Sequence, residues 1–166
     1  MRSKRIILVL LMALGFAVAA HAQYPRAFGV RGGYGLEASY QHCVGDPHFI
    51  EVDVGLDLVG QRGFRLTGIM DFVLWRPYMG RVGTWSLYAG PGVSTGYVYN
   101  SKDAPEPSFV VAACVQLGLE FAPWTHFAMA ADLRPMYGWD FSSKTSYFRG
   151  GFWYGLIPSL SLKYLF

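Results

Sequence analysis

The sequence lacks a long hydrophobic run beyond residue 19. A transmembrane helix needs about 20 consecutive apolar residues, and no later segment approaches that length. Nevertheless, 52% of the residues are hydrophobic and the mean hydropathy is positive, at +0.24. The absence of such a run excludes a membrane protein built from spanning helices after this point. The hydrophobic residues must instead be dispersed among polar ones.

Cysteine and metal-ligating residues are also scarce. The two cysteines are Cys43, expected in a turn, and Cys114, expected in the middle of a strand. This placement disfavours a disulfide, although an oxidising compartment would permit one. No spacing of cysteine or histidine is typical of a metal site, and no cofactor is predicted.

The N-terminus has the order of a secretory signal peptide. A basic segment at residues 1–5 precedes the uncharged apolar run 6–19 and the small-x-small sequence Ala20-His21-Ala22. We therefore predict a signal peptide at residues 1–22 and one domain at residues 23–166, with an uncleaved anchor as the less favoured alternative.

The basic excess of the chain belongs to this signal peptide. The full sequence has 14 basic and 11 acidic residues, and loss of Arg2, Lys4 and Arg5 would leave 11 of each. A nucleic-acid partner is therefore not predicted.

The segment from Tyr154 to Phe166 alternates between apolar and polar residues. Such alternation predicts a strand with different surroundings on its two faces. Its length is close to the roughly 9–11 residues of a tilted strand that crosses a bilayer. A final strand with a terminal aromatic residue resembles the end of outer-membrane β-barrel proteins, which the barrel-assembly machinery reads during insertion. The resemblance implies that the insertion signal comprises Tyr154, Leu160, Leu162, Tyr164 and Phe166.

Similar alternation recurs along the chain between turn signals. Residues 27–40 form either one strand or a hairpin, which gives a total of seven or eight strands. Bacterial barrels have even strand numbers, so we predict an all-β fold: an eight-stranded antiparallel up-and-down transmembrane β-barrel. The expected strands lie near residues 28–31, 36–41, 50–58, 64–72, 85–93, 111–121, 127–134 and 154–166. A loop is expected from Gly138 to about Gly150.

This topology assigns sides to the connections. Those near Tyr34, Gly60, Lys102 and Ser142 are expected outside the cell, and those near Gly45, Gly80 and Trp124 in the periplasm. Aromatic residues gather near both ends of the expected strands, as in the aromatic girdles of membrane barrels.

The non-apolar face of the strands carries mainly Gly, Ser and Ala with charges of both signs. Small residues suit the crowded interior of a narrow barrel, and buried charges must be paired. We predict a structural charge network inside the barrel; a proton or ion path is the alternative. Its expected members are Arg31, Glu37, Glu51, Asp53, Asp57, Arg65, Asp71, Glu120, Asp132, Arg134 and Lys163.

Three motifs and the end of the chain strengthen the resemblance to known proteins: Trp85-Ser-Leu-Tyr-Ala-Gly-Pro-Gly-Val93, Gln116-Leu-Gly-Leu-Glu-Phe121, Asp132-Leu-Arg-Pro135 and the final Leu162-Lys-Tyr-Leu-Phe166. In this order they resemble small outer-membrane barrels of the OmpA/OmpX-like group, especially stand-alone members of Bacteroidetes-type bacteria. The resemblance implies an outer-membrane location and contact with lipid. It implies no particular activity.

No catalytic site is predicted. The histidines beyond the signal peptide are His42, His48 and His126, which are expected near the periplasmic side without a serine two residues on. We expect a non-enzymatic protein that acts structurally or binds an extracellular ligand or surface partner through its outer loops. The alternatives are a narrow channel, a barrel that binds lipid or a small ligand, a secreted lipocalin-like carrier and, less favoured, a lipid A-modifying enzyme.

Overall fold

The computed structural model describes residues 26–45, 47–59, 62–77, 83–99, 107–124, 126–149 and 157–166. The predicted signal peptide, residues 1–22, lies outside these ranges. None of the described segments forms a helix long and apolar enough to cross a membrane. The described strands are β1 (Arg26–Gly32), β2 (Gly35–Cys43), β3 (Phe49–Asp57), β4 (Arg62–Trp75), β5 (Thr84–Tyr99), β6 (Pro107–Trp124), β7 (Phe127–Leu133), β8 (Met136–Asp140), β9 (Thr145–Arg149) and β10 (Ser159–Leu165).

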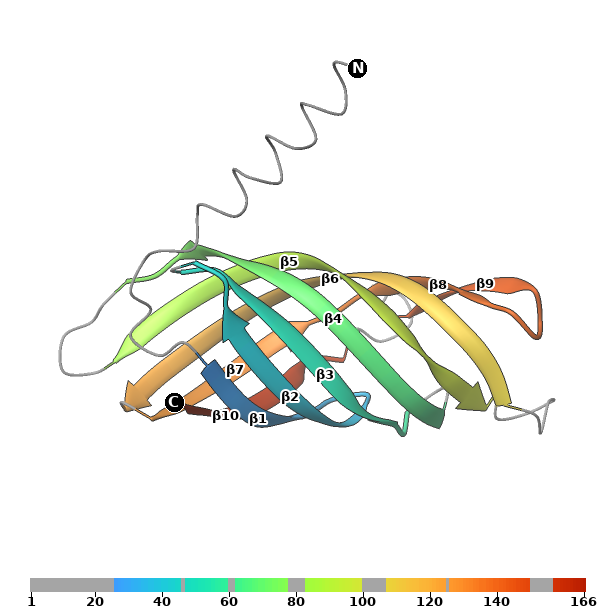
Figure 1. The fold of residues 1–166 in the computed structure, drawn as a ribbon, viewed down its shortest axis with the longest axis horizontal. Helices are drawn as coiled ribbons and strands as arrows, with labels where there is room; N and C mark the ends of the chain where they lie inside the picture. Colours follow the sequence, from blue (N-terminus) through green and yellow to red (C-terminus); the bar gives the residue numbers. More distant parts are fainter. Residues whose placement is uncertain are drawn as a thin grey trace, which may run out of the picture.

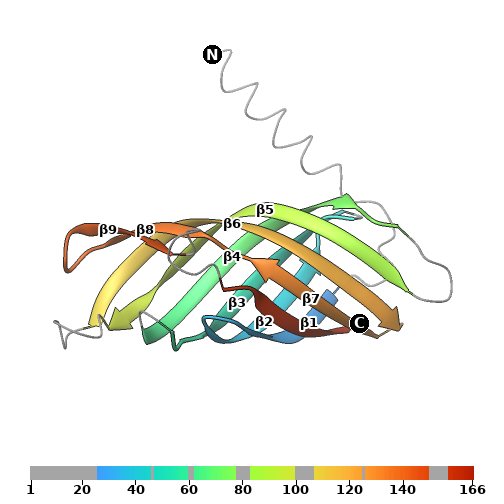
Figure 2. The same cartoon turned by 180° about the vertical axis from the view of Figure 1, so that it is seen from behind.

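The strands form a closed antiparallel barrel, because β5 pairs with both β4 and β6 (Figures 1 and 2). Both β7 and β8 pair with β6, so they are successive parts of one barrel strand, interrupted at Arg134 and Pro135. The next position around the barrel is shared by β9, which pairs with β8, and β10, which pairs with β7 and β1. Counted around the barrel, the described strands make eight, which confirms the predicted eight-stranded antiparallel barrel.

Residues 27–40 form a hairpin rather than one strand. β1 and β2 pair from Arg26↔His42 to Gly32↔Leu36, and the chain reverses at Gly33 and Tyr34. The even strand count, which favoured the hairpin in the sequence, is therefore correct.

The predicted loop from Gly138 to about Gly150 is wrong in its described part. Residues 136–140 and 145–149 form strands β8 and β9, and the reversal is confined to the turn Phe141–Lys144. β8 continues the antiparallel pairing with β6, for example Val111↔Trp139. Residues 136–140 therefore form a strand because they pair with the long β6. The sequence pattern of residues 138–150 alone did not reveal this pairing.

The strands extend to different distances from the C-terminal end of the barrel. The C-terminal end holds the turn at Val44–His48 and the contact between Phe166 and Arg26. β5 and β6 run nearly the full length of the barrel, while β1 and β2 end well short of the β8–β9 turn at the opposite end (Figure 1).

The strand registers give the tilt of the barrel. Residues directly opposite one another can be followed from Trp85 around all eight strands, through Phe121, Met129, Leu162, Val30, Ala38, Val54 and Leu66, and the path returns to β5 at Thr95. The displacement from residue 85 to residue 95 is 10 residues. A stagger of this size in eight strands corresponds to a tilt of about 40° and an interior that side chains fill.

Tyrosine rings in the interior lie over glycines of the neighbouring strand. Tyr88 is opposite Gly118, and Tyr147 is opposite Gly138. A Cβ atom built on Gly118 would collide with the Tyr88 ring, and one on Gly138 would lie 2.7 Å from Cζ of Tyr147. These glycines therefore leave the space that each ring occupies, an arrangement known to stabilise β-sheets.

The Gly118→Ala substitution is expected to destabilise the barrel by about 1–3 kcal/mol, because the Tyr88 ring must leave its position in a filled interior. Gly68→Ala in β4 is the matched control, since a Cβ there would have nothing within 4 Å. Urea unfolding in detergent micelles measures both variants. Equal stability of the two variants would contradict the packing of Tyr88 against Gly118.

Candidate functional site: the charged interior

The charged residues predicted for the interior all lie there. Each is at most 9% exposed, and each points inward from its strand. Indeed, all eight acidic residues in the described part of the chain are buried. The interior therefore holds many ionisable groups in a space that water barely reaches, so the pairing of these groups decides what the site can do.

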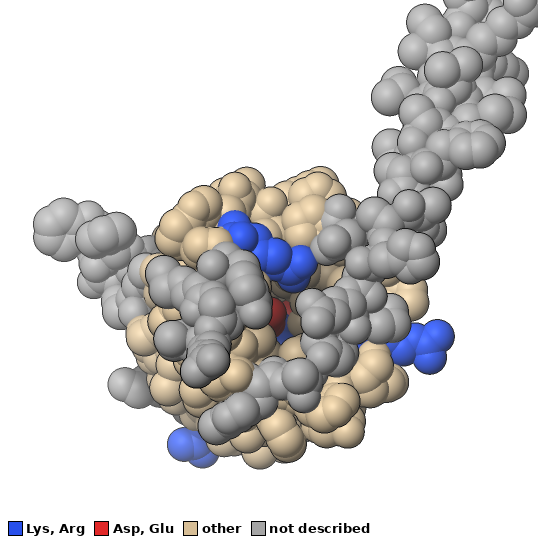
Figure 3. Space-filling view, turned by 90° about the vertical axis from the view of Figure 1, so that its left-hand side faces the viewer, with Lys and Arg blue, Asp and Glu red and all other residues tan. Residues whose placement is uncertain are grey.

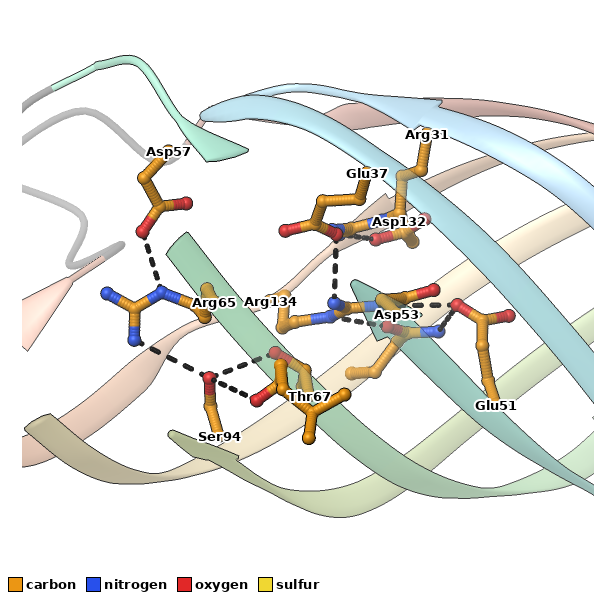
Figure 4. Close-up of polar contacts among 12 residues, drawn as sticks. Arg31, Glu37, Glu51, Asp53, Asp57, Arg65, Thr67, Ser94, Asp132 and Arg134 are labelled. Atoms are coloured by element: carbon orange, nitrogen blue, oxygen red, sulfur yellow. Dashed lines mark hydrogen bonds and ion pairs between the residues drawn. The ribbon is translucent and has the colours of Figure 1, made fainter. Parts of the chain in front are cut away.

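Arg134 lies at the centre of the network (Figure 4). It follows β7, on the opposite side of the barrel from β3, and its Nη2 reaches Asp53 at 2.5 Å and Glu51 at 3.3 Å. Its Nε donates to Oε1 of Gln116 at 2.7 Å. Because these bonds join opposite walls, the guanidinium lies across the lumen.

Arg31 forms the second centre, beside Arg134. Its Nη1 donates to Oε2 of Glu37 at 2.7 Å, and the guanidinium also pairs with Asp132. The same Oε2 of Glu37 lies 3.4 Å from Nη1 of Arg134. Glu37 thus joins the two arginines, and strands β1, β2, β3 and β7 are linked through charged side chains.

Lys163 forms the third centre, nearer the C-terminal end. Its ammonium donates to Oε2 of Glu51 at 2.7 Å and lies 3.5 Å from Glu120. It is also 5.6 Å and 5.8 Å from the ring centroids of Phe49 and Tyr88. Glu51 therefore connects Lys163 with Arg134, so the three cationic centres form one continuous network.

This central network contains more acids than bases. Three cations, Arg31, Arg134 and Lys163, face the six carboxyl groups of Glu37, Glu51, Asp53, Asp71, Glu120 and Asp132. Asp71 is fully buried, and its Oδ2 accepts a hydrogen bond from the Gln116 amide at 3.2 Å. Among the ion pairs of the described residues none involves Asp71, and its Oδ1 has no hydrogen-bond partner there.

A separate cluster lies towards the opposite end. Oδ2 of Asp57 accepts from Nε of Arg65 at 2.6 Å and from Nη1 of Arg149 at 2.5 Å. Arg65 also donates to the Tyr147 hydroxyl at 3.3 Å, and the Arg149 guanidinium lies 4.0 Å from the centroid of the Tyr34 ring. Two arginines thus share a single carboxylate oxygen in this outer cluster.

Sequence reasoning missed several interior residues. Arg149 and Asp140 fall in the segment predicted as a loop, and Tyr88 and Gln116 are uncharged. Asp140 accepts hydrogen bonds from the Ser108 hydroxyl and from the backbone N–H groups of Ser142 and Ser143, which anchors the β8–β9 turn. The alternation of β6 places Gln116 inward, so a search for all inward polar residues would have found it.

The described residues offer no grouping of three His, Cys, Asp or Glu side chains suited to a metal ion. Cys43 and Cys114 are not bonded to each other. His42, His48 and His126 all lie at the C-terminal end, and Nδ1 of His48 accepts a hydrogen bond from the backbone N–H of Val73.

The outer surface is apolar around the whole barrel. Large hydrophobic side chains are exposed on every barrel strand, including Val30 (52%), Val93 (68%), Val115 (55%) and Leu162 (51%). In the described part of the chain the exposed charges are Arg26, Arg62, Arg76 and Lys144, all at strand ends or in turns. Viewed from the C-terminal end, acidic atoms are visible within the ring of strands, and basic side chains lie around its rim (Figure 3).

Most residues of the predicted insertion signal lie on this apolar surface. Leu160, Leu162 and Tyr164 point outward from β10, and Phe166 is also exposed. Tyr164 packs edge to face against Phe127 with centroids 5.4 Å apart. Tyr154 lies outside the described residues.

Comparison with known proteins supports the fold. No family model and no curated protein matches the chain. Among solved structures, the N-terminal β-barrel domain of Pseudomonas aeruginosa OprF is similar, with a TM-score of 0.60 and 14% sequence identity over 85% of this chain and 95% of that one. At this identity the similarity concerns the fold alone.

Proposed function

We propose that this protein is an integral outer-membrane β-barrel that is exported by a signal peptide at residues 1–22. Its outer-membrane partners would be lipid and, during insertion, the barrel-assembly machinery. The main observation behind this proposal is that an apolar surface encircles a closed barrel. The charged side chains of the described residues all lie inside the barrel, at strand ends or in turns. A water-soluble protein rarely exposes so large an apolar surface, whereas a lipid-facing wall requires one.

The interior supports a structural, non-enzymatic role. Arg134 and Lys163 cross the lumen to carboxylates on β3, so the interior is filled by paired side chains. We therefore propose a closed barrel whose interactions with other molecules occur at the end opposite the C-terminus, which would face outside the cell. Steady ion conductance in planar bilayers would contradict the closed interior and support the alternative of a narrow channel.

The finer assignment rests on sequence resemblance. The fold is like that of the OprF barrel domain, and we propose membership of the OmpA/OmpX-like group, in its stand-alone Bacteroidetes-type form. An extracellular ligand or surface partner is part of this proposal, with the outer connections near residues 100–107 and 139–148 as the expected contact region.

The membrane location predicts a depth-dependent cost of a charge on the outer wall. Val115 lies midway along β6 between the outward-facing Phe109 and Phe121. Val115→Lys is expected to destabilise the folded protein in lipid vesicles by about 2–4 kcal/mol, because the ammonium would lie near the bilayer midplane. Tyr99→Lys, at the end of β5, is the matched control and is expected to cost about 0–1 kcal/mol.

Urea unfolding in vesicles measures both variants, and a heat-dependent shift in gel mobility checks that they fold. If Val115→Lys were as stable as Tyr99→Lys, or if the protein without its signal peptide were monodisperse without detergent, the proposal would fail.

A further inference from the structure

We propose that the outer cluster of Arg65, Arg149 and Asp57 is a binding site for an oxyanion such as a phosphate group. The site lies inside the barrel at the end opposite the C-terminus. It goes beyond the proposed structural function, because it assigns a ligand to a part of the interior.

The first argument is charge. Two guanidinium groups face one carboxylate, and both donate to the same oxygen, Oδ2 of Asp57. Arg65 is 1% exposed, and the Arg149 side chain is 11% exposed. The other partners of Arg65 among the described residues, the Ser94 and Tyr147 hydroxyls, are neutral. A buried pair of cations with a single counter-charge retains one uncompensated positive charge, which an anion would neutralise.

The second argument is unused hydrogen-bonding capacity. Nη2 of Arg65 and Nε of Arg149 are buried donors without a hydrogen-bond partner in the described part of the chain. Oδ1 of Asp57 is likewise without a hydrogen-bond partner there, but it belongs to the carboxylate whose Oδ2 already binds both arginines. Buried donors are nearly always satisfied, so the two unpaired donors are open to a further acceptor. In Figure 4 the free nitrogen of Arg65 points away from the central network, toward the end of the barrel where β3 finishes.

The third argument is preorganisation. The Arg149 guanidinium carbon lies 4.0 Å from the centroid of the Tyr34 ring, a cation–π contact that restricts its position. Nη1 of Arg65 is held by the Tyr147 hydroxyl at 3.3 Å. Both guanidiniums converge on Oδ2 of Asp57, and two convergent guanidiniums suit the several acceptor oxygens of a phosphate, which binds arginine through paired, charge-assisted hydrogen bonds.

The test uses the refolded protein, residues 23–166, in detergent micelles, with inorganic phosphate as the probe at constant ionic strength. Isothermal titration calorimetry should show saturable binding to the wild type. Arg149→Gln should weaken binding at least tenfold. Lys144→Gln, which removes one exposed positive charge at the same end, should leave the affinity unchanged.

Asp57→Asn is expected to change the phosphate affinity in the opposite direction to Arg149→Gln. The carboxylate competes with phosphate for both arginines, so its neutralisation should tighten phosphate binding about tenfold, which a purely structural ion pair would not do. Absence of saturable binding to a folded wild type, or equal affinity of the wild type and Arg149→Gln, would overturn the proposal. Because the assay is performed in micelles, it is independent of whether the protein resides in the outer membrane.

Discussion

Arg134→Gln is expected to destabilise the barrel by about 3–5 kcal/mol, because removal of one partner leaves buried carboxylates without their cation. Arg134 reaches Asp53 at 2.5 Å, Glu51 at 3.3 Å and Glu37 at 3.4 Å. Glutamine is shorter and neutral, so it can replace only part of the hydrogen bonding and none of the charge. The central network already has more acids than bases, and this substitution increases the excess.

Arg62→Gln is the matched control for Arg134→Gln. Arg62 is the exposed first residue of β4, so the same chemical change there is expected to alter stability by less than about 0.5 kcal/mol. Urea unfolding in detergent micelles, followed by tryptophan fluorescence, measures both. A similar small change in the two variants would mean that the cross-lumen bonds contribute little to stability.

A second substitution can identify the charge responsible. Adding Asp53→Asn to Arg134→Gln removes the carboxylate that the arginine had paired, so the double variant should recover part of the lost stability. Directly bonded residues show coupling energies of about 0.5–3 kcal/mol. Strict additivity of the two changes would contradict a direct interaction between Arg134 and Asp53.

The barrel could be predicted from the sequence because a period of two is set locally by strand geometry. The inward positions of Arg31, Glu51 and Lys163 follow from alternation alone, since each directly follows a large apolar residue that faces outward. Turn signals then gave seven or eight strands, and the even number typical of bacterial barrels selected eight, with the short β1–β2 hairpin.

The pairing inside the barrel could not be predicted in the same way. Arg134 meets Asp53 because the strands are staggered by 10 residues around the barrel, and a stagger is a property of the closed sheet rather than of any one strand. The same applies to Tyr88 and Gly118, whose contact depends on the register between β5 and β6. Sequence reasoning therefore identified the charged members of the central network but not its bonds.

The failed part of the prediction has a local cause. The segment from Gly138 to Gly150 contains Ser142, Ser143 and Lys144, which are typical of a loop, and its two strands have only five residues each. Pairing with the long β6 makes strands of such short segments. This missed hairpin also hid Arg149 and Tyr147, and with them the outer cluster.

Two acids in the central network should respond in opposite ways to the same chemical change. Glu51→Gln is expected to cost about 3–5 kcal/mol, because Glu51 accepts from Lys163 at 2.7 Å and lies 3.3 Å from Nη2 of Arg134. Asp71→Asn is expected to leave stability unchanged or raise it by about 1 kcal/mol. A fully buried carboxylate that no described cation pairs with is costly to desolvate, and asparagine keeps the acceptor for Gln116.

Each of these two variants is the control for the other, since both convert a buried carboxylate into an amide of nearly the same size. Urea unfolding at pH 7 in the same micelles measures the two side by side. If Asp71→Asn were as destabilising as Glu51→Gln, Asp71 would have a compensating cation, and the acid excess of the central network would be balanced. If neither variant changed stability, the network as a whole would contribute little, and packing of side chains such as Tyr88 would hold the barrel closed.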